Sequence, residues 1–300
     1  FYLNQLMQEM QKKNLLYEQK IKTYENQFDQ LNKDFTILLF SGHCIHPLSS
    51  DFYKTPDDDW HMPPQELHNY INEIKRLKEK YSGQIQIVTG FEADYFADSK
   101  IGSAIPDFAM YKEFSPDYLI GSVHFVNTPK GFYTVDHTVE NIKENLNKLY
   151  FDSVTKTIDG KKAVCDYFAC EREMLSKGKF SIIGHPDLIR KRNGILNFFN
   201  ENENWYIDEI KVLAKAISKA GVVVEINTGA IARGIMDDVY PSTPFLEYLY
   251  SYGVPVCINS DCHNADLMDC AYDKACNIAK KAGYTELIYP VAGKNISIKL

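Results

Sequence analysis

The sequence predicts an α/β protein built on a parallel sheet or barrel. Short apolar runs alternate with longer amphipathic segments of helical spacing, and polar residues follow directly after each run. The strand candidates are 36–40, 85–91, 118–123, 180–183, 222–226 and 254–258. Strands that alternate with helices favour βαβ crossovers, so the predicted strands run parallel.

The clearest predicted helix starts at Pro63 and Pro64 and ends near Gly83. Its spacing buries one face that includes Leu67 and Ile71, and proline in the first turn with glycine after the last turn is typical of helix ends. Further helices are expected at 138–150, 162–177, 206–220, 243–252 and 266–282. The tail 287–300, which is broken by a glycine, is expected to form a terminal hairpin.

The chain is expected to divide into a helical segment at 1–33 and one domain at 34–300. Tyr17, Ile21 and Tyr24 are spaced to form an apolar stripe on a helix in the first segment. Nothing in 34–300 resembles a linker, a repeat or a break in composition. Because Phe1 is not an initiator methionine, we expect that the chain is processed or begins inside a longer reading frame.

Composition restricts the partners and the compartment. The chain has 300 residues with 33 basic and 40 acidic side chains, a net charge of −7, which argues against nucleic acid and anionic membranes. No apolar run approaches the roughly 20 residues that span a bilayer, and polar residues interrupt the N-terminus where a signal-peptide core would lie. Seven cysteines without a CxxC pair indicate reduced thiols. A cytoplasmic protein is expected.

Histidines and carboxylates follow the predicted strands. In parallel α/β folds, ligands bind at the carboxyl ends of the strands. An Asp-x-His sequence at the last strand also places both side chains on one face. A mixture of imidazole nitrogens and carboxylate oxygens suits zinc, manganese or iron. The candidate metal ligands are His43, Glu92, His124, His185, Asp261 and His263.

The remaining histidines, and two cysteines beside candidate ligands, are not expected to bind metal or to act as nucleophiles. His46, His61, His68 and His137 lie in polar loops or beside the first long helix, and we expect them to be solvated or to face the substrate. Cys44 and Cys262 adjoin candidate ligands but have no base paired with them in the sequence. Buried structural thiols are the expectation for both cysteines.

From about residue 34 to the end, the chain resembles the polymerase-and-histidinol-phosphatase (PHP) superfamily, and within it the histidinol-phosphate phosphatases. The order and spacing of several motifs carry the resemblance together, whereas each motif alone is weak. The motifs are Gly90-Phe91-Glu92-Ala93-Asp94-Tyr95, Ser122-Val123-His124-Phe125, Gly184-His185-Pro186-Asp187-Leu188-Ile189, Ile226-Asn227-Thr228-Gly229 and Ser260-Asp261-Cys262-His263.

The resemblance implies a distorted, TIM-like seven-stranded (β/α) barrel that holds one to three divalent metal ions. Glu92 would bridge two metals, and His124 and His185 would complete one of the two sites. His43 and His263 would bind another metal, and Asp261 would join the site that Glu92 shares. The residues expected to be catalytic are Glu92, Asp261 and His263.

The same resemblance suggests how a phosphate ester would be bound and cleaved. Metal ions lower the pKa of bound water and neutralise phosphate charge. Arginine suits phosphate because its planar fork donates two parallel hydrogen bonds. Arg233 matches a position where the family carries a basic residue, and Arg190 is a second candidate. For Arg190, which lies in a basic run with Lys191 and Arg192, a solvated turn is the alternative.

The chain departs from the family at its start. Members open with a strand that carries Asp-x-His-x-His, whereas the matching region here reads Glu9, Gln11 and Tyr17 on a predicted helix. Gly42 also replaces an acidic residue before His43. The first barrel strand is therefore expected to be missing or replaced by the N-terminal helix. Among the expected sites, only that of Glu92, His124 and His185 keeps all its protein ligands.

The resemblance implies a metal-dependent phosphomonoesterase, with L-histidinol phosphate as the expected small-molecule substrate and histidine biosynthesis as the context. Two alternatives remain. One is a phosphatase of the same fold that acts on another small phosphate ester. The other is a non-catalytic protein that binds a metabolite or partner through a cleft lacking the first metal-binding motif.

Overall fold

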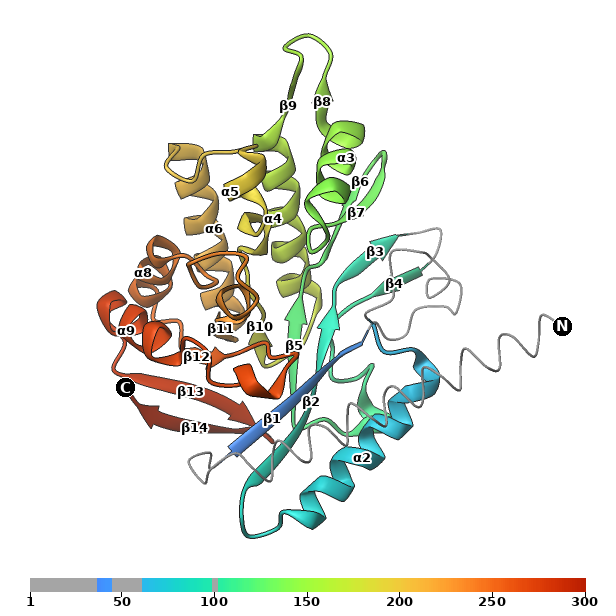
Figure 1. Ribbon diagram of the computed structural model, residues 1–300, viewed down its shortest axis with the longest axis vertical. Coiled ribbons are helices and arrows are strands. Elements are labelled where there is room, and N and C mark those ends of the chain that lie inside the picture. Colours follow the sequence, from blue (N-terminus) through green and yellow to red (C-terminus); the bar gives the residue numbers. More distant parts are fainter. Residues whose placement is uncertain (1–36, 45–60, 99–101) are drawn as a thin grey trace, which may run out of the picture.

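The structure, a computed structural model, describes residues 37–44, 61–98 and 102–300. Its centre is one parallel sheet with the strand order β1-β2-β5-β10-β11-β12 (Figure 1). The strands are β1 (Ile37–Cys44), β2 (Gln86–Asp94), β5 (Tyr118–Ser122), β10 (Ile182–Ile183), β11 (Val223–Asn227) and β12 (Val256–Asn259). All six strand predictions are confirmed. The expectations for 1–33, for a replaced first strand and for His46 fall outside the described residues.

The sheet is curled into part of a barrel, and its central strands are buried along their length. Every residue of β5 and β11 is buried, and so are all residues of β2 after the first. Continuous apolar strands are typical of parallel sheets covered on both faces. Within the described part of the chain, β1 and β12 form the two edges of the sheet. The predicted α/β class with a distorted, barrel-like sheet is confirmed.

The predicted helices are present as α2 (Leu67–Lys80), α3 (Val139–Tyr150), α4 (Gly160–Lys177), α6 (Asn204–Ala220), α8 (Thr243–Ser251) and α9 (Tyr272–Ala282), with short helices α5 (Asn193–Leu196) and α7 (Gly229–Ala232) between them. Helices α4, α6, α8 and α9 pack one against the next around the outside of the sheet (Figure 1). The last helix begins later than predicted, because a 3-10 turn and the left-handed backbone of Ala271 (φ 61°) precede it. No helix in the described residues is long and apolar enough to cross a membrane.

Helix α2 is tied to the edge of the sheet by Tyr70. The Tyr70 hydroxyl donates to the Gly90 carbonyl of β2 at 2.8 Å and accepts from the Gly42 amide of β1 at 3.0 Å. A side chain at Gly42 would meet Met62 and Tyr70, so the close approach of the helix needs glycine there. This contact fixes β1 beside β2, where both strands end at the candidate site.

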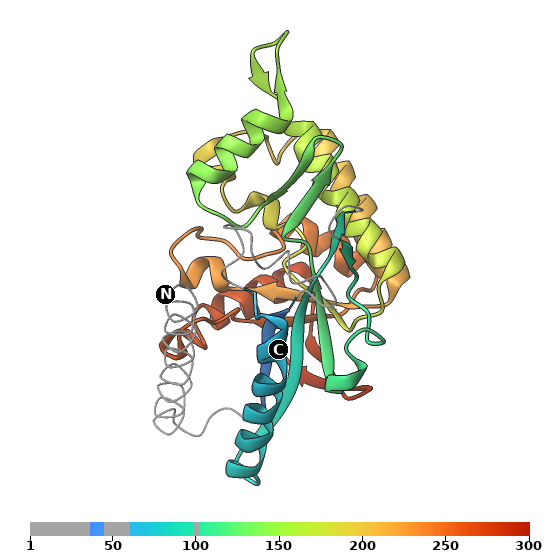
Figure 2. The same cartoon turned by 90° about the vertical axis from the view of Figure 1, so that its right-hand side faces the viewer.

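In the part of the chain that the structure describes, four antiparallel pairs of strands complete the fold. They are β3 (Phe96–Asp98) with β4 (Gly102–Ala104), β6 (Phe125–Thr128) with β7 (Gly131–Thr134), β8 (Phe151–Asp152) with β9 (Thr157–Ile158), and β13 (Glu286–Val291) with β14 (Lys294–Lys299). The β8–β9 hairpin projects away from the sheet in both views (Figures 1 and 2). The last hairpin confirms the prediction for the tail, and its Tyr289 hydroxyl bonds both the amide and the carbonyl of Ile258 in β12.

Candidate metal centre

Glu92, His124 and His185 meet at the carboxyl ends of β2, β5 and β10. One ligand atom from each lies within 4.8 Å of the others, and all three residues are buried. Glu92 Oε1 lies 3.0 Å from His185 Nε2 and 3.7 Å from His124 Nε2, and it accepts a hydrogen bond from Ser122 Oγ at 2.8 Å. The structure therefore brings together the three residues that the sequence assigned to one metal.

His43, Asp261 and His263 form a second group with mutual ligand distances within 4.8 Å. His43 pairs with Glu92 in the β1–β2 register, which places its Nε2 3.5 Å from Glu92 Oε2. Asp261 Oδ1 lies 3.2 Å from His263 Nε2, and the His263 side chain is 61% exposed. This group connects the two edge strands, because His43 lies near the end of β1, and Asp261 and His263 follow β12. All six predicted ligands thus lie around one centre, although their roles in metal binding remain a prediction.

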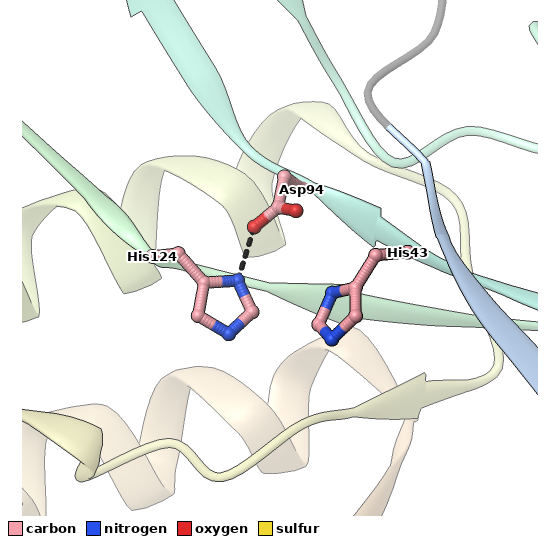
Figure 3. Close-up of side chains that lie close together, drawn as sticks. All are labelled: His43, Asp94 and His124. Carbon is pink, nitrogen blue, oxygen red and sulfur yellow. Dashed lines mark hydrogen bonds and ion pairs between the residues drawn. The ribbon is translucent and has the colours of Figure 1, made fainter. Parts of the chain in front are cut away.

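Asp94 is a further member of the centre that the sequence analysis did not identify. Figure 3 shows its carboxylate beside the rings of His43 and His124, and these three residues also meet the distance condition for a metal group. Asp94 Oδ1 is hydrogen-bonded to His124 Nδ1, which leaves His124 Nε2 facing Glu92. A carboxylate on the far nitrogen of a ligand histidine sets the tautomer and orientation of the ring. The spacing of Glu92 and Asp94, two residues apart on one strand, could have revealed it.

His61 holds the other oxygen of Asp94. Its Nε2 lies 2.5 Å from Asp94 Oδ2, and neither side chain has any exposed surface. The expectation that His61 is solvated or faces the substrate is therefore wrong. Burial alone would raise the pKa of Asp94, but the charges and hydrogen bonds of His124 and His61 lower it well below its usual range. Nothing in the local sequence around His61 indicates this pairing, because Asp94 is distant along the chain.

The charges at the centre favour a bound cation. Burial would raise the pKa of Glu92, but His43 and His185 lower it to about 2. Burial would lower the pKa of His185, but its hydrogen bond to Glu92 and the charge of Glu92 raise it to about 10. Glu92 is thus anionic, and in the metal-free protein His185 carries a proton that a metal ion would replace. Buried nitrogen and oxygen donors that converge in this way fit a divalent ion such as zinc, manganese or iron.

A polar pocket of about 80 Å³ opens at this centre. His43, Glu92, Glu225, Asn227, Asp261 and His263 are among the residues that line it. Cys262 also lines the pocket, so the expectation of a buried thiol is not met there. Cys44 is fully buried, and burial raises the pKa of its thiol to about 12, as expected for a structural cysteine.

The two candidate arginines occupy different environments. Arg233 contacts Asp261, a residue that lines the pocket: its Nη2 is 2.7 Å from Asp261 Oδ2, and its side chain is 29% exposed. Arg190 is 6% exposed and is held by Glu201 Oε2 and Asp238 Oδ2, each at 2.7 Å, and by Asp187. Its guanidinium therefore stabilises the loops around it, and a phosphate would have to displace carboxylates. This burial corrects the alternative of a solvated turn, and the carboxylate partners argue against phosphate binding by Arg190.

The fold and the centre define a class of protein, the α/β proteins whose candidate metal ligands gather at the carboxyl edge of a curled parallel sheet. Comparison with family models makes the assignment specific. The PHP domain model matches residues 32–229. The chain belongs to the PHP domain family.

Individual relatives agree with this assignment. A "Probable histidinol-phosphatase" of Schizosaccharomyces pombe is 24% identical over 86% of this chain and 80% of the relative. The "Histidinol-phosphatase" of Bacillus subtilis is 26% identical over 82% of this chain and 88% of the relative. The crystal structure of histidinol phosphate phosphatase from Lactococcus lactis, complexed with zinc, L-histidinol and phosphate, matches with a TM-score of 0.60 and 16% identity over 93% of this chain and 92% of that one. This structural likeness supports the fold.

Proposed function

We propose that this protein is a metal-dependent histidinol-phosphate phosphatase, which converts L-histidinol phosphate and water into L-histidinol and phosphate in histidine biosynthesis. The observation that carries the proposal is the convergence of Glu92, His124 and His185. Glu92 also lines a polar pocket together with Asp261, which contacts Arg233. The relatives that match most of the chain are named histidinol-phosphatases, which supports this substrate above other phosphate esters.

The residues of the centre have distinct proposed tasks. Glu92, His124 and His185 would hold one divalent ion, and His43, Asp261 and His263 would hold a second, with Glu92 between the two groups. Divalent ions held there would supply a water of lowered pKa as the nucleophile and would neutralise phosphate charge. Ser122 orients Glu92 through its hydroxyl. Arg233 lies where its remaining N–H groups can bind a phosphate oxygen.

The arrangement also supports two wider proposals. The substrate is a small phosphate ester, because the pocket is small and polar. The protein works in the cytoplasm, because all seven cysteines are free thiols, as is usual in reducing compartments.

Activity measurements test the proposal directly. Protein loaded with zinc, manganese or iron should release phosphate from L-histidinol phosphate faster than from glycerol phosphate or phosphoserine. Glu92→Gln should abolish turnover and reduce the metal content, whereas Glu247→Gln, on an exposed face of α8, should change neither. Faster hydrolysis of another ester would support the alternative substrate. Metal binding without turnover on any ester would support the non-catalytic alternative.

A further inference from the structure

Glu225 is a buried carboxylate at the centre that belongs to none of the three candidate ligand groups. It lies on β11, is 3% exposed and lines the metal pocket. Burying a carboxylate is costly unless hydrogen bonds satisfy its oxygens. The bonds that Glu225 makes therefore indicate what it does in the fold.

Glu225 joins the ends of three neighbouring strands. Its Oε1 accepts from the backbone amide of His185, after β10, at 3.1 Å, and from Asn227 Nδ2 of β11 at 2.8 Å. Its Oε2 accepts from Asn259 Nδ2 of β12 at 2.8 Å. One side chain thus connects the strand ends that lead to His185 and Asp261.

Both of these candidate ligands have strained backbones. His185 has φ 22° and Asp261 has φ 47°, in the left-handed region that residues other than glycine seldom adopt. Such conformations are unfavourable for residues other than glycine and persist where the surroundings hold them. Glu225 accepts a hydrogen bond from the backbone amide of His185. It also accepts one from the side chain of Asn259, which lies two residues before Asp261.

The packing around Gly184 keeps Glu225 close to this backbone. A Cβ at Gly184 would lie 2.4 Å from Ser122 Oγ and 3.6 Å from Glu225 Oε1. Ser122 in turn donates to Glu92. The absence of a side chain at Gly184 therefore lets the segment between β10 and His185 approach Ser122, with Glu225 in van der Waals range.

We propose that Glu225 is a positioning residue that holds His185 and the segment before Asp261 in their ligand geometry without itself binding the metal. The proposal rests on the proposed function, because it concerns the same centre. Its first test needs neither metal nor substrate, so the two can fail separately.

Two substitutions distinguish the hydrogen bonds that Glu225 makes from its negative charge. In Glu225→Gln, the amide oxygen can still accept from His185 and Asn227, and the amide nitrogen can donate to Asn259 once that side chain flips its own amide. Glu225→Ala removes all three bonds. Val224→Ala, a buried neighbour on the same strand, is the matched control for loss of packing.

The first measurement is amide hydrogen exchange in the metal-free protein. We expect Glu225→Ala to accelerate exchange of the His185 amide relative to the amides of the neighbouring strands. In Glu225→Gln and Val224→Ala, the His185 amide should stay as protected, relative to those strands, as in the unmodified protein. Equal protection of His185 in Glu225→Ala and the unmodified protein would overturn the proposal.

The second measurement is cobalt(II) binding, followed by the visible spectrum, which reports the number and arrangement of ligands. Glu225→Ala should weaken binding by about 10–100-fold, as is usual for residues that orient ligands, and should alter the spectrum. Glu225→Gln should keep the spectrum of the unmodified protein. Loss of one cobalt equivalent in Glu225→Gln, with the His185 amide still protected, would show that Glu225 is a metal ligand and would refute the proposal.

Discussion

Arg233 contacts Asp261 through both of its terminal nitrogens. Nη2 donates to Asp261 Oδ2 at 2.7 Å, and Nη1 donates to the Asp261 backbone carbonyl at 2.9 Å. A residue proposed to bind phosphate therefore also supports a residue proposed to bind metal. Substitutions at Arg233 should affect both functions.

We expect Arg233→Ala to raise KM for histidinol phosphate by about 10–100-fold, since a charge-assisted hydrogen bond contributes about 1.5–3 kcal/mol. Arg233→Lys should have an intermediate effect, because lysine keeps the charge but not the planar fork. Steady-state kinetics and inhibition by inorganic phosphate measure the change. Unchanged KM and unchanged phosphate inhibition in Arg233→Ala would exclude it from phosphate binding.

Gly229 leaves no room for a side chain beside this pair. A Cβ there would lie 2.7 Å from both Arg233 Nη2 and Asp261 Oδ2. Gly229→Ala should therefore separate the two groups and raise KM while the protein stays folded. Gly194→Ala is a suitable control because its Cβ would meet nothing within 4 Å. If both variants have the KM of the unmodified protein, the contact between Arg233 and Asp261 does not matter for substrate binding.

Asp94→Asn should weaken metal binding by about 10–100-fold. An amide can donate to His124 Nδ1 and so favour the tautomer that carries its proton on Nε2, which cannot bind a metal. Metal titration measures the effect, and circular dichroism checks the fold. Asp117→Asn, at a carboxylate that bonds Thr89 and Lys78 away from the centre, is the control. Affinity equal to that of the unmodified protein would show that Asp94 does not orient His124.

Glu171 should make stability depend on pH. It is fully buried on α4, where burial raises its pKa from 4.5 to about 8 and Tyr167 donates to it at 2.7 Å. A raised folded-state pKa means that its contribution to stability is complete below the unfolded value and is lost as pH rises through about 8. The loss is on the order of a few kcal/mol at most.

Glu171→Gln removes this titration. In urea unfolding of the metal-free protein at several pH values, the variant should gain stability relative to the unmodified protein between about pH 5 and pH 9. Parallel curves for the two proteins over that interval would show that Glu171 does not titrate in the folded state.

Much of the fold and of the candidate centre could be predicted from the sequence. The alternation of apolar runs and helical spacing is local, and so is the position of His43, Glu92 and His185 shortly after apolar runs. Because parallel strands place their carboxyl ends at one edge, these local signals were enough to predict that the six candidate ligands would lie near one another.

The roles of Asp94, His61 and Arg190 could not be predicted in the same way. The spacing of Asp94 from Glu92 could have indicated that it belongs to the centre. Its bonds to His61 and His124, however, join residues 33 and 30 positions away along the chain. Arg190 follows a ligand motif, but the fold surrounds its guanidinium with three carboxylates. Sequence spacing does not report such long-range pairing or the burial that accompanies it.

The sequence by itself thus determined the α/β class, the strands and the set of donors at their ends, because these follow from local periodicity and from chain order. Only the tertiary structure decided how those donors are held. It placed Glu225 between three strand ends and Asp94 between two histidines, because strand register and side-chain burial arise only when distant segments pack together.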